Sequence, residues 1–422
     1  MAQALPMTQR ISYTDLYERW EKSNWSATAL DFSVDKEHWQ ERFSDKQRRA
    51  ALWNYALFLH GEDSVADNLS PYIEAAPKEE MKYFLATQQV DEARHAVFFA
   101  RFMREVVEDG ADDVAGSLAR TRPDLTWGFR QVFERLDKMA DELRRDRSLP
   151  MLAKGIALYH IVIEATLAQP GQHFIQSYLE RDELMPGFQE GMRNVALDEQ
   201  RHIGFGVKVL ADLVQMDPEC RDAVAELLRE VMPKSVGVLV PPGWDRSYTE
   251  CFGFTLEDIY TEAILSMETK MRSAGLPLEE LPGALPIDLS VPPRERAERA
   301  IKLLEGNIIG EKLGPPARDP ETQALMFDSV RLSVDPAAAN GRTTIQWDFT
   351  DSEPWVLHVD NGSTRVEQAW AEDPDITLRA RYEDWVDISA GRTDPWLAIA
   401  TGKLRPRGKL RSILKMAKLF PR

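Results

Sequence analysis

Four stretches between about Asp45 and Leu213 repeat apolar residues at the three- and four-residue spacing of amphipathic helices. They read KQRRAALWNYALFLHGEDSVADNL, KEEMKYFLATQQVDEARHAVFFARFMREVVED, MLAKGIALYHIVIEATLAQPGQHFIQSYLE and FQEGMRNVALDEQRHIGFGVKVLADLV. Helices with one apolar face each bury those faces against one another, so the pattern predicts a helical bundle. Pro170-Gly171 interrupts the third stretch, where we expect a kink or a locally unwound turn.

The pattern changes after about Gly275, where a proline-rich segment with little helical periodicity, PLEELPGALPIDLSVPPRE, is typical of a linker. Further on, residues 343–349 and 375–380 alternate apolar and polar positions as half-buried strands do. Asp360-Asn361-Gly362 is a hairpin signal. We therefore predict an α+β multidomain protein. Its expected parts are a bundle over residues 10–285, a linker over 286–317 and a smaller α/β domain over 318–422.

Composition narrows the classes of function. A net charge of -17 argues against nucleic acid as the main partner, because binding a polyphosphate requires a basic face. The two cysteines, Cys220 and Cys251, are too few for a disulfide framework or a thiolate metal site. The N-terminus lacks the apolar core of a secretory signal, and no uninterrupted apolar run approaches the length of a membrane span. We expect a cytoplasmic protein.

The last residues, GKLRPRGKLRSILKMAKLFPR, contain eight basic side chains and no acidic one. We interpret them as a short amphipathic helix. Such a segment is compatible with weak contact with an anionic membrane surface, but an ordinary solvated face is the favoured interpretation.

The motif that carries chemistry occurs twice, as DEARH at Asp91–His95 and DEQRH at Asp198–His202. A glutamate and a histidine three residues apart project from one face of a helix, so each motif offers a carboxylate and an imidazole to the same point. A further glutamate precedes each motif on a separate predicted helix: Glu62 lies before Glu92, and Glu164 lies before Glu199.

Four buried carboxylates are too costly unless they are protonated or paired with cations, and two divalent ions bring their sum to zero. Oxygen-rich ligation with one histidine per metal suits iron or manganese. The alternative is that the glutamates form surface ion pairs with Arg94 and Arg201. The predicted ligands are Glu62, Glu92, His95, Glu164, Glu199 and His202.

The aspartates of the two motifs, Asp91 and Asp198, are candidates to accept hydrogen bonds from the ligand imidazoles and to fix their tautomers; solvated acids are the alternative. The other histidines on these helices, His60, His160 and His173, have no glutamate at ligand spacing. We interpret them as structural or pocket residues.

At these residues the chain resembles the ferritin-like dimetal carboxylate proteins, and among them the small subunit of ribonucleotide reductase, over roughly residues 10–285. That subunit has a radical-bearing tyrosine seven residues after the first motif's glutamate. Here the position is Phe99, which forms no tyrosyl radical.

The chain is more similar to the R2-like ligand-binding oxidases, which have a valine three residues after the first ligand and a tyrosine five residues before the fourth. Val65 and Tyr159 occupy these positions. The resemblance implies a bond between the tyrosine oxygen and the valine Cβ, a manganese and iron cofactor with two irons as the alternative, dioxygen as oxidant, a long-chain fatty acid ligand, and a homodimer.

Val65 lies beside Glu62 on any α-helix, but five residues turn Tyr159 about 140° away from Glu164. A π-bulge would bring the tyrosine back. Gln172, eight residues after Glu164, aligns with a pocket tyrosine of the family, a difference that bears on the ligand's identity.

The C-terminal stretch from about Arg318 resembles the sterol carrier proteins, which enclose an apolar tunnel for fatty acyl or sterol-like molecules. Its aromatic residues line such a tunnel or fill an ordinary core. They are Trp347, Phe349, Trp355, Trp370, Trp385 and Trp396.

Together these features predict a dioxygen-activating dimetal oxidase that acts on a lipid-like molecule. Two alternatives remain: a dimetal oxygenase of an amine or another small metabolite, and a non-enzymatic lipid-binding metalloprotein. The choice of a lipid rests on analogy between folds.

Overall fold

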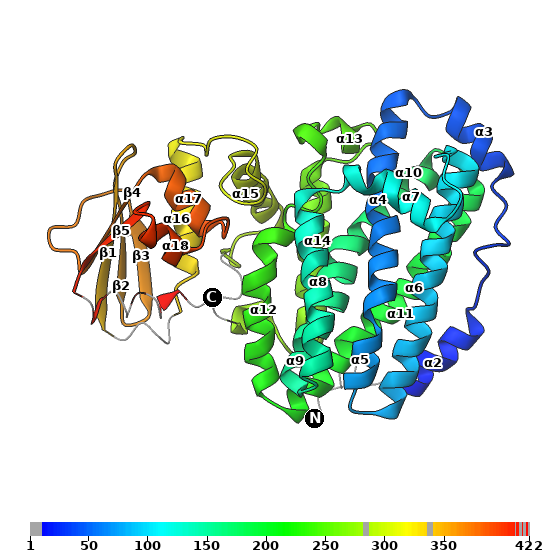
Figure 1. Ribbon diagram of the computed structural model, residues 1–422, viewed down its shortest axis with the longest axis horizontal. Coiled ribbons are helices and arrows are strands. Elements are labelled where there is room, and N and C mark those ends of the chain that lie inside the picture. Colours follow the sequence, from blue (N-terminus) through cyan, green and yellow to red (C-terminus); the bar gives the residue numbers. More distant parts are fainter. Residues whose placement is uncertain are drawn as a thin grey trace. The chain divides into compact units, whose positions relative to one another are not determined.

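The computed structural model describes residues 11–281, 287–335, 341–409, 411, 412, 416, 419 and 420. The chain divides into two compact units (Figure 1). The first comprises the chain up to Val224 together with Val238–Pro277, and the second comprises Ala225–Gly237 and the chain from Leu278 onward.

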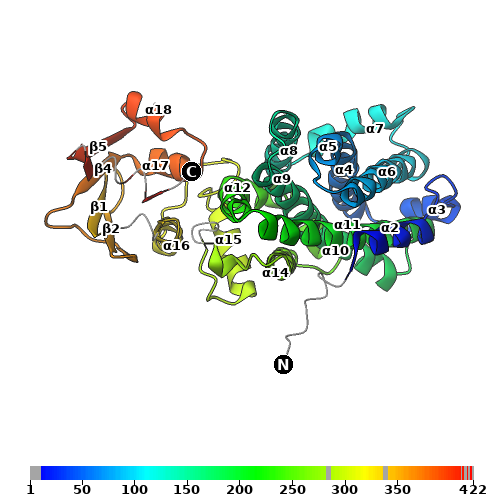
Figure 2. The ribbon, with the colours of Figure 1, turned by 90° about the horizontal axis from the view of Figure 1, so that it is seen from below.

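The first unit is the predicted helical bundle. The four apolar stretches form long helical segments whose axes run side by side (Figures 1 and 2). The first packs along the second, and the fourth packs along the third. Their bounds are α4 (Asp45–Asn68), α6 (Glu79–Phe102), the composite α9 (Leu149–Ile156), η3 (Ala157–Ala168) and α10 (Gln169–Arg181), and α11 (Pro186–Met216).

Further helices surround these four segments. α8 (Trp127–Arg145) packs on α4 and α9, and α14 (Leu256–Ser273) packs on η3 and α10. The remaining helices of this unit are α2 (Tyr13–Lys22), α3 (Ser33–Glu41), α5 (Ser70–Ala75), η1 (Met103–Val107), α7 (Val114–Thr121), η2 (Arg122–Asp124), the start of α12 (Glu219–Ser235), η4 (Pro242–Trp244) and α13 (Ser247–Glu250).

The irregularity expected in the third segment lies just before Pro170. Residues Ala157–Ala168 form a π-helix, and α10 begins at Gln169 with Pro170 in its first turn, where a missing N–H costs little. The Thr166 hydroxyl donates to the carbonyl of Ile161, five residues earlier, at 2.7 Å. The loosened turn therefore spans the positions of both Tyr159 and Glu164.

The composite helix Leu149–Arg181 is long and apolar enough to cross a membrane by length and composition. Its most apolar window is 78% buried inside the protein, as in the core helix of a bundle.

The second unit contains a five-stranded sheet with the order β3-β2-β1-β4-β5. β1 pairs antiparallel with β2 and parallel with β4, and β5 pairs antiparallel with β4. The predicted hairpin is confirmed: Asn361 and Gly362 turn with φ of 48° and 87°, the positive values that a two-residue hairpin turn requires. The strands are β1 (Arg342–Phe349), β2 (Trp355–Asp360), β3 (Ser363–Glu367), β4 (Ile376–Ala380) and β5 (Leu404–Gly408).

Helices of this unit complete an apolar core with the sheet. Ile345, Trp347 and Phe349, at alternate positions of β1, are buried in it, and Phe327 of α16 packs its ring against Trp347 and Trp355. These helices are α15 (Pro293–Glu305), α16 (Pro320–Leu332), α17 (Tyr382–Ser389) and α18 (Pro395–Ala400). The second part of α12 and η5 (Leu278–Glu280) also belong to this unit but contribute no described residue to that core.

The stretch 286–317 differs from the linker that its prolines indicated, because it contains α15. Pro293 stands in the first turn of this helix, where proline is favoured, and Leu303 near its end is buried in the core of the sheet. Pro292 and Pro293 mark the start of this helix.

The basic C-terminal segment is helical only in its second half, where the described residues 411, 412, 416 and 419 lie in the expected helix. Its first part is strand β5, with Arg405 and Arg407. Farther on, Leu419 is fully buried, and Met416 and Phe420 pack against the core of the unit. The rest of the predicted helix, residues 410, 413–415, 417, 418, 421 and 422, lies outside the described residues.

The six aromatic residues named above separate into two groups. Trp347, Phe349 and Trp355 are core residues, and Trp385 packs against that core. Trp370 and Trp396 are 63% and 62% exposed. Ring packing within the core accounts for the first group.

Candidate metal centre

The structure brings all six predicted ligands together in the interior of the bundle. Each of the four long segments contributes to the site, because the side chains lie on the faces that the helices turn toward one another. All six are buried. They are Glu62 on α4, Glu92 and His95 on α6, Glu164 on η3, and Glu199 and His202 on α11.

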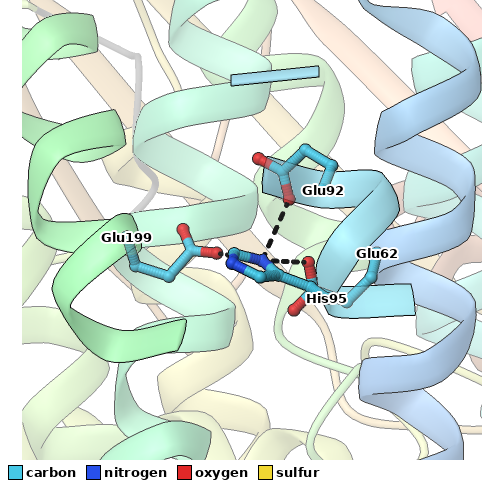
Figure 3. A group of neighbouring side chains, drawn as sticks. All are labelled: Glu62, Glu92, His95 and Glu199. Atoms are coloured by element: carbon cyan, nitrogen blue, oxygen red, sulfur yellow. Dashed lines mark hydrogen bonds and ion pairs between the residues drawn. The ribbon is translucent and has the colours of Figure 1, made fainter. Parts of the chain in front are cut away.

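Two groups of ligand atoms lie close enough to hold an ion each, with the atoms of a group within 4.8 Å of one another. One group is Glu62, Glu92, His95 and Glu199 (Figure 3). The other is Glu92, Glu164 and His202. Glu92 belongs to both groups, as a bridging carboxylate would.

Each imidazole turns its Nδ1 toward the carboxylates. The Nδ1 of His95 lies 3.2 Å from Glu62 Oε2 and 3.6 Å from Glu199 Oε1. The Nδ1 of His202 lies 3.1 Å from Glu92 Oε1 and 3.6 Å from Glu199 Oε2. Glu199 therefore faces both histidines.

The other nitrogen of each imidazole bonds to the aspartate of the opposite motif. His95 Nε2 lies 3.1 Å from Asp198 Oδ2, and His202 Nε2 lies 3.1 Å from Asp91 Oδ2. With Nε2–H donated to an aspartate, Nδ1 presents its lone pair to a metal. The expected hydrogen bonds occur, but they cross between α6 and α11.

Two arginines and two tryptophans hold the aspartates. Arg94 donates to Asp198 at 3.0 Å and also bonds Asp91, while Arg201 donates to Asp91 at 3.1 Å and to Asp198 at 2.5 Å. The indole N–H of Trp20 donates to Asp91 at 2.9 Å, and that of Trp25 to Asp198 at 2.8 Å. The arginines thus pair with the aspartates and leave the glutamates to the imidazoles.

The electrostatics of the cluster favour added cations. Burial raises the pKa of Glu62, Glu164 and Glu199, and neighbouring carboxylates raise it further. Burial alone would lower the pKa of His95 and His202, but the facing glutamates and the aspartate hydrogen bonds raise it well above its usual value. Without metals the cluster therefore retains protons, which metal ions would displace.

The donor atoms fit a pair of metal ions. Glu164 Oε2 is buried without a hydrogen-bond partner among the described residues, and Glu199 Oε2 and His202 Nδ1 make no hydrogen bond there beyond the ion pairs given above. Such orphaned acceptors are rare in protein interiors. Carboxylates with one imidazole for each metal are the ligands that manganese and iron accept.

Tyr159 and Val65 are both buried in the bundle. The π-helix turns Tyr159 into the site, where its hydroxyl donates to Glu92 Oε1 at 2.6 Å. Val65 is buried on α4, one turn beyond Glu62.

Sequence reasoning missed Gln88, a fully buried residue of the site. Its side-chain amide donates to Glu164 at 2.8 Å and to the hydroxyl of Tyr159 at 3.0 Å. The available signal was a polar residue four positions before Glu92, on the same face of an otherwise apolar helix.

The remaining candidates lie around the site or away from it. His60 bonds Thr121, and His160 bonds Gln88. The half-exposed His173 pairs with Glu262. Phe99 stacks on Phe58, and Gln172 is buried with its Nε2 unpartnered among the described residues.

Each of the two units matches the model of a known protein family. The family model of the ribonucleotide reductase small chain matches residues 7–236. The chain belongs to this family. A second family model, of the SCP-2 sterol transfer family, matches residues 327–421, in agreement with the expected sterol-carrier-like domain.

Solved structures show the same fold. An R2-like ligand-binding oxidase from Sulfolobus acidocaldarius is 22% identical, with a TM-score of 0.51 over 67% of this chain and 93% of that one. A variant of an R2-like ligand-binding oxidase with an aerobically reconstituted Mn/Fe cofactor is 21% identical, with a TM-score of 0.55 over 63% and 95%. Another variant, with an anaerobically reconstituted Mn/Fe cofactor, is 22% identical, with a TM-score of 0.53 over 62% and 93%.

Proposed function

We propose that this protein is a dimetal oxidase that activates dioxygen. The observation that carries the proposal is the buried convergence of four carboxylates and two imidazoles in two groups that share Glu92. The proposed ligands are Glu62, Glu92, His95, Glu164, Glu199 and His202. We propose manganese with iron as the occupants, and two irons as the alternative; the Mn/Fe cofactors of similar folds support this choice.

When bound, the metal pair binds dioxygen and supplies two of the four electrons that reduce it to water. The chain can supply the other two. A bond between the Tyr159 oxygen and the Val65 Cβ forms with loss of the phenolic hydrogen and the Cβ hydrogen, which releases two electrons and two protons. The hydrogen bond from Tyr159 to Glu92 gives the phenolic proton an acceptor at the site.

The substrate we propose is a long-chain fatty acid or another lipid-like molecule. Two findings support it: similar folds are named ligand-binding oxidases, and the second unit matches a sterol transfer family. We further propose that the protein is cytoplasmic and forms a homodimer.

Peptide mapping of the metal-loaded protein tests the proposal. After exposure to air, the peptides that contain Val65 and Tyr159 should be joined and lighter than their sum by two hydrogens. The same protein kept anaerobic should yield them separately. A Tyr159→Phe variant should bind both metals without forming the link.

The rival dimetal oxygenase predicts a different result. If the loaded protein consumes dioxygen only with an added reductant and the peptides stay unlinked, the last two electrons come from outside the chain. The oxidase proposal would then be wrong. Binding of both metals with no consumption of dioxygen, with or without a reductant, would favour the non-enzymatic lipid-binding metalloprotein.

A further inference from the structure

The metal centre is close to symmetric under exchange of α6 with α11. Each helix gives one glutamate and one histidine, and each histidine bonds the other helix's aspartate. The symmetry breaks four residues before the motif glutamates. α6 has Gln88 at this position and α11 has Val195, and both are fully buried.

Gln88 places its polar atoms on one side of the centre. The amide nitrogen lies 2.8 Å from Glu164 Oε1, 3.0 Å from the Tyr159 hydroxyl and 3.4 Å from Glu92 Oε1. The Glu92 oxygen that it contacts, Oε1, is the one that faces His202, whereas Oε2 faces His95. Among the described residues, Gln88 has no hydrogen bond with Glu62 or His95. Its amide hydrogens therefore act on the group that contains Glu164.

His160 fixes which way the amide points. Its Nε2 lies 3.1 Å from Gln88 Oε1. Burial, and then the charge of His202, lowers the pKa of His160 to about 3, so the ring is neutral and has one N–H. An N–H of His160 Nε2 donated to Gln88 Oε1, together with the carboxylate oxygens of Glu164 and Glu92 that accept on the opposite side, requires the amide nitrogen to face the metal centre.

In this orientation the two oxygens of the Glu164 carboxylate have different roles. Oε1 accepts from Gln88, whereas Oε2 is buried without a partner among the described residues. A carboxylate held by one oxygen presents the other in a fixed direction. Tyr159 accepts from Gln88 as well, which leaves its own hydrogen directed at Glu92.

We infer that Gln88 is a positioning residue that acts on the Glu164 metal position alone and makes the two positions inequivalent. The inference rests on the proposed ligand set. Inequivalent positions are what a centre of two different metals requires. The outer contacts of metal ligands typically change metal affinity by roughly 10- to 100-fold when removed.

Anaerobic equilibrium dialysis with Mn²⁺ alone tests the inference, because it needs neither dioxygen nor substrate. In Gln88→Leu, one of the two binding steps should weaken by roughly 10- to 100-fold while the other stays unchanged. Gln89→Leu is the matched control. It removes a glutamine amide from the next position of α6, where the amide donates to the carbonyl of Ala66 at 2.9 Å.

A second variant, Glu164→Ala, shows to which metal position the weakened binding step belongs. Glu164→Ala should retain a single Mn²⁺, and adding Gln88→Leu should change that remaining affinity less than threefold, because the group on which Gln88 acts is already gone. Equal weakening of both steps in Gln88→Leu, or no weakening of either, would overturn the inference. So would a full 10-fold loss in the Glu164→Ala background.

The outcome is separate from that of the proposed function. If the wild-type protein binds two Mn²⁺ but forms no link between Tyr159 and Val65, the oxidase proposal fails. The dialysis still decides the role of Gln88.

Discussion

Gly206 is the residue on which the approach of α11 to η3 depends. A Cβ added at this position would lie 2.2 Å from the Cβ of His160. No flexible side chain can absorb that overlap, because the nearest atom belongs to the root of a buried ring. The glycine therefore lets His160 lie beside α11, where the imidazole can reach Gln88.

We expect Gly206→Ala to destabilise the protein by about 1–3 kcal/mol, the usual cost of overpacking a buried site. Gly204→Ala is the control on the same helix, because nothing lies within 4 Å of its added Cβ. That change should be neutral or stabilise by roughly 0.5–1 kcal/mol, since alanine favours the helix. Urea unfolding measures both variants, and equal effects would show that the contact with His160 does not matter.

Some residues of the metal centre could be predicted from the sequence and others could not. Spacing within a helix is local, so the paired motifs and their preceding glutamates predicted the ligands that the structure brings together. The crossing of Asp91 to His202 and of Asp198 to His95 depends on how α6 faces α11, which no local pattern encodes. Gln88 was missed for the same reason, since its partners lie on η3.

At the level of elements, the start of α11 is held by a residue of α3. The carboxylate of Asp35 accepts from the backbone N–H groups of Gly187 and Phe188 at 2.9 and 2.6 Å. These N–H groups have no partner within their own helix. α11 carries Glu199 and His202, so the cap anchors the helix that supplies one of the two proposed histidine ligands.

The same carboxylate makes stability depend on pH. Burial raises the pKa of Asp35 to about 6 from an ordinary 3.8. The folded state therefore binds this proton more tightly than the unfolded state, and the stability from Asp35 falls as pH rises from about 4 to about 6. In urea unfolding at equal metal loading, wild type should lose stability relative to Asp35→Asn across this interval. Parallel pH profiles would contradict the assignment.

Helices and strands could be predicted from the sequence where their apolar residues recur at a regular spacing. The prediction failed where proline residues are compatible with either a linker or the start of a helix. The π-helix was expected from the need to turn Tyr159 toward Glu164, and it occurs over Ala157–Ala168. Proline-rich sequence before α15 indicated a linker, but proline also favours the first turn of a helix. The burial of Leu303 in the core around the sheet distinguishes a helix start from a linker, and this burial depends on tertiary structure.

For the whole molecule, each unit has its own set of core residues. The ligand helices α4, α6, η3 and α11 belong to the first unit. The apolar core around the sheet draws its residues from Leu303 to Leu419 and none from Ala225–Gly237, although that part of α12 belongs to the second unit. Metal binding by the first unit and the folding of the second unit can therefore be studied on separate fragments.

We expect a fragment ending at Pro277 to fold and bind two metals per chain, because it contains every proposed ligand and the helices that pack around them. A fragment from residue 287 onward should unfold cooperatively on its own, since its core is complete. Elemental analysis and circular dichroism measure these outcomes, with the intact chain as control.

Within the first fragment, amide hydrogen exchange should become faster in α12 from Ala225 on, where the chain belongs to the removed unit, but not in α6 or α11. A first fragment that stays folded yet loses its metals would refute the independence of the units, and would mean that the second unit helps to hold the metal centre.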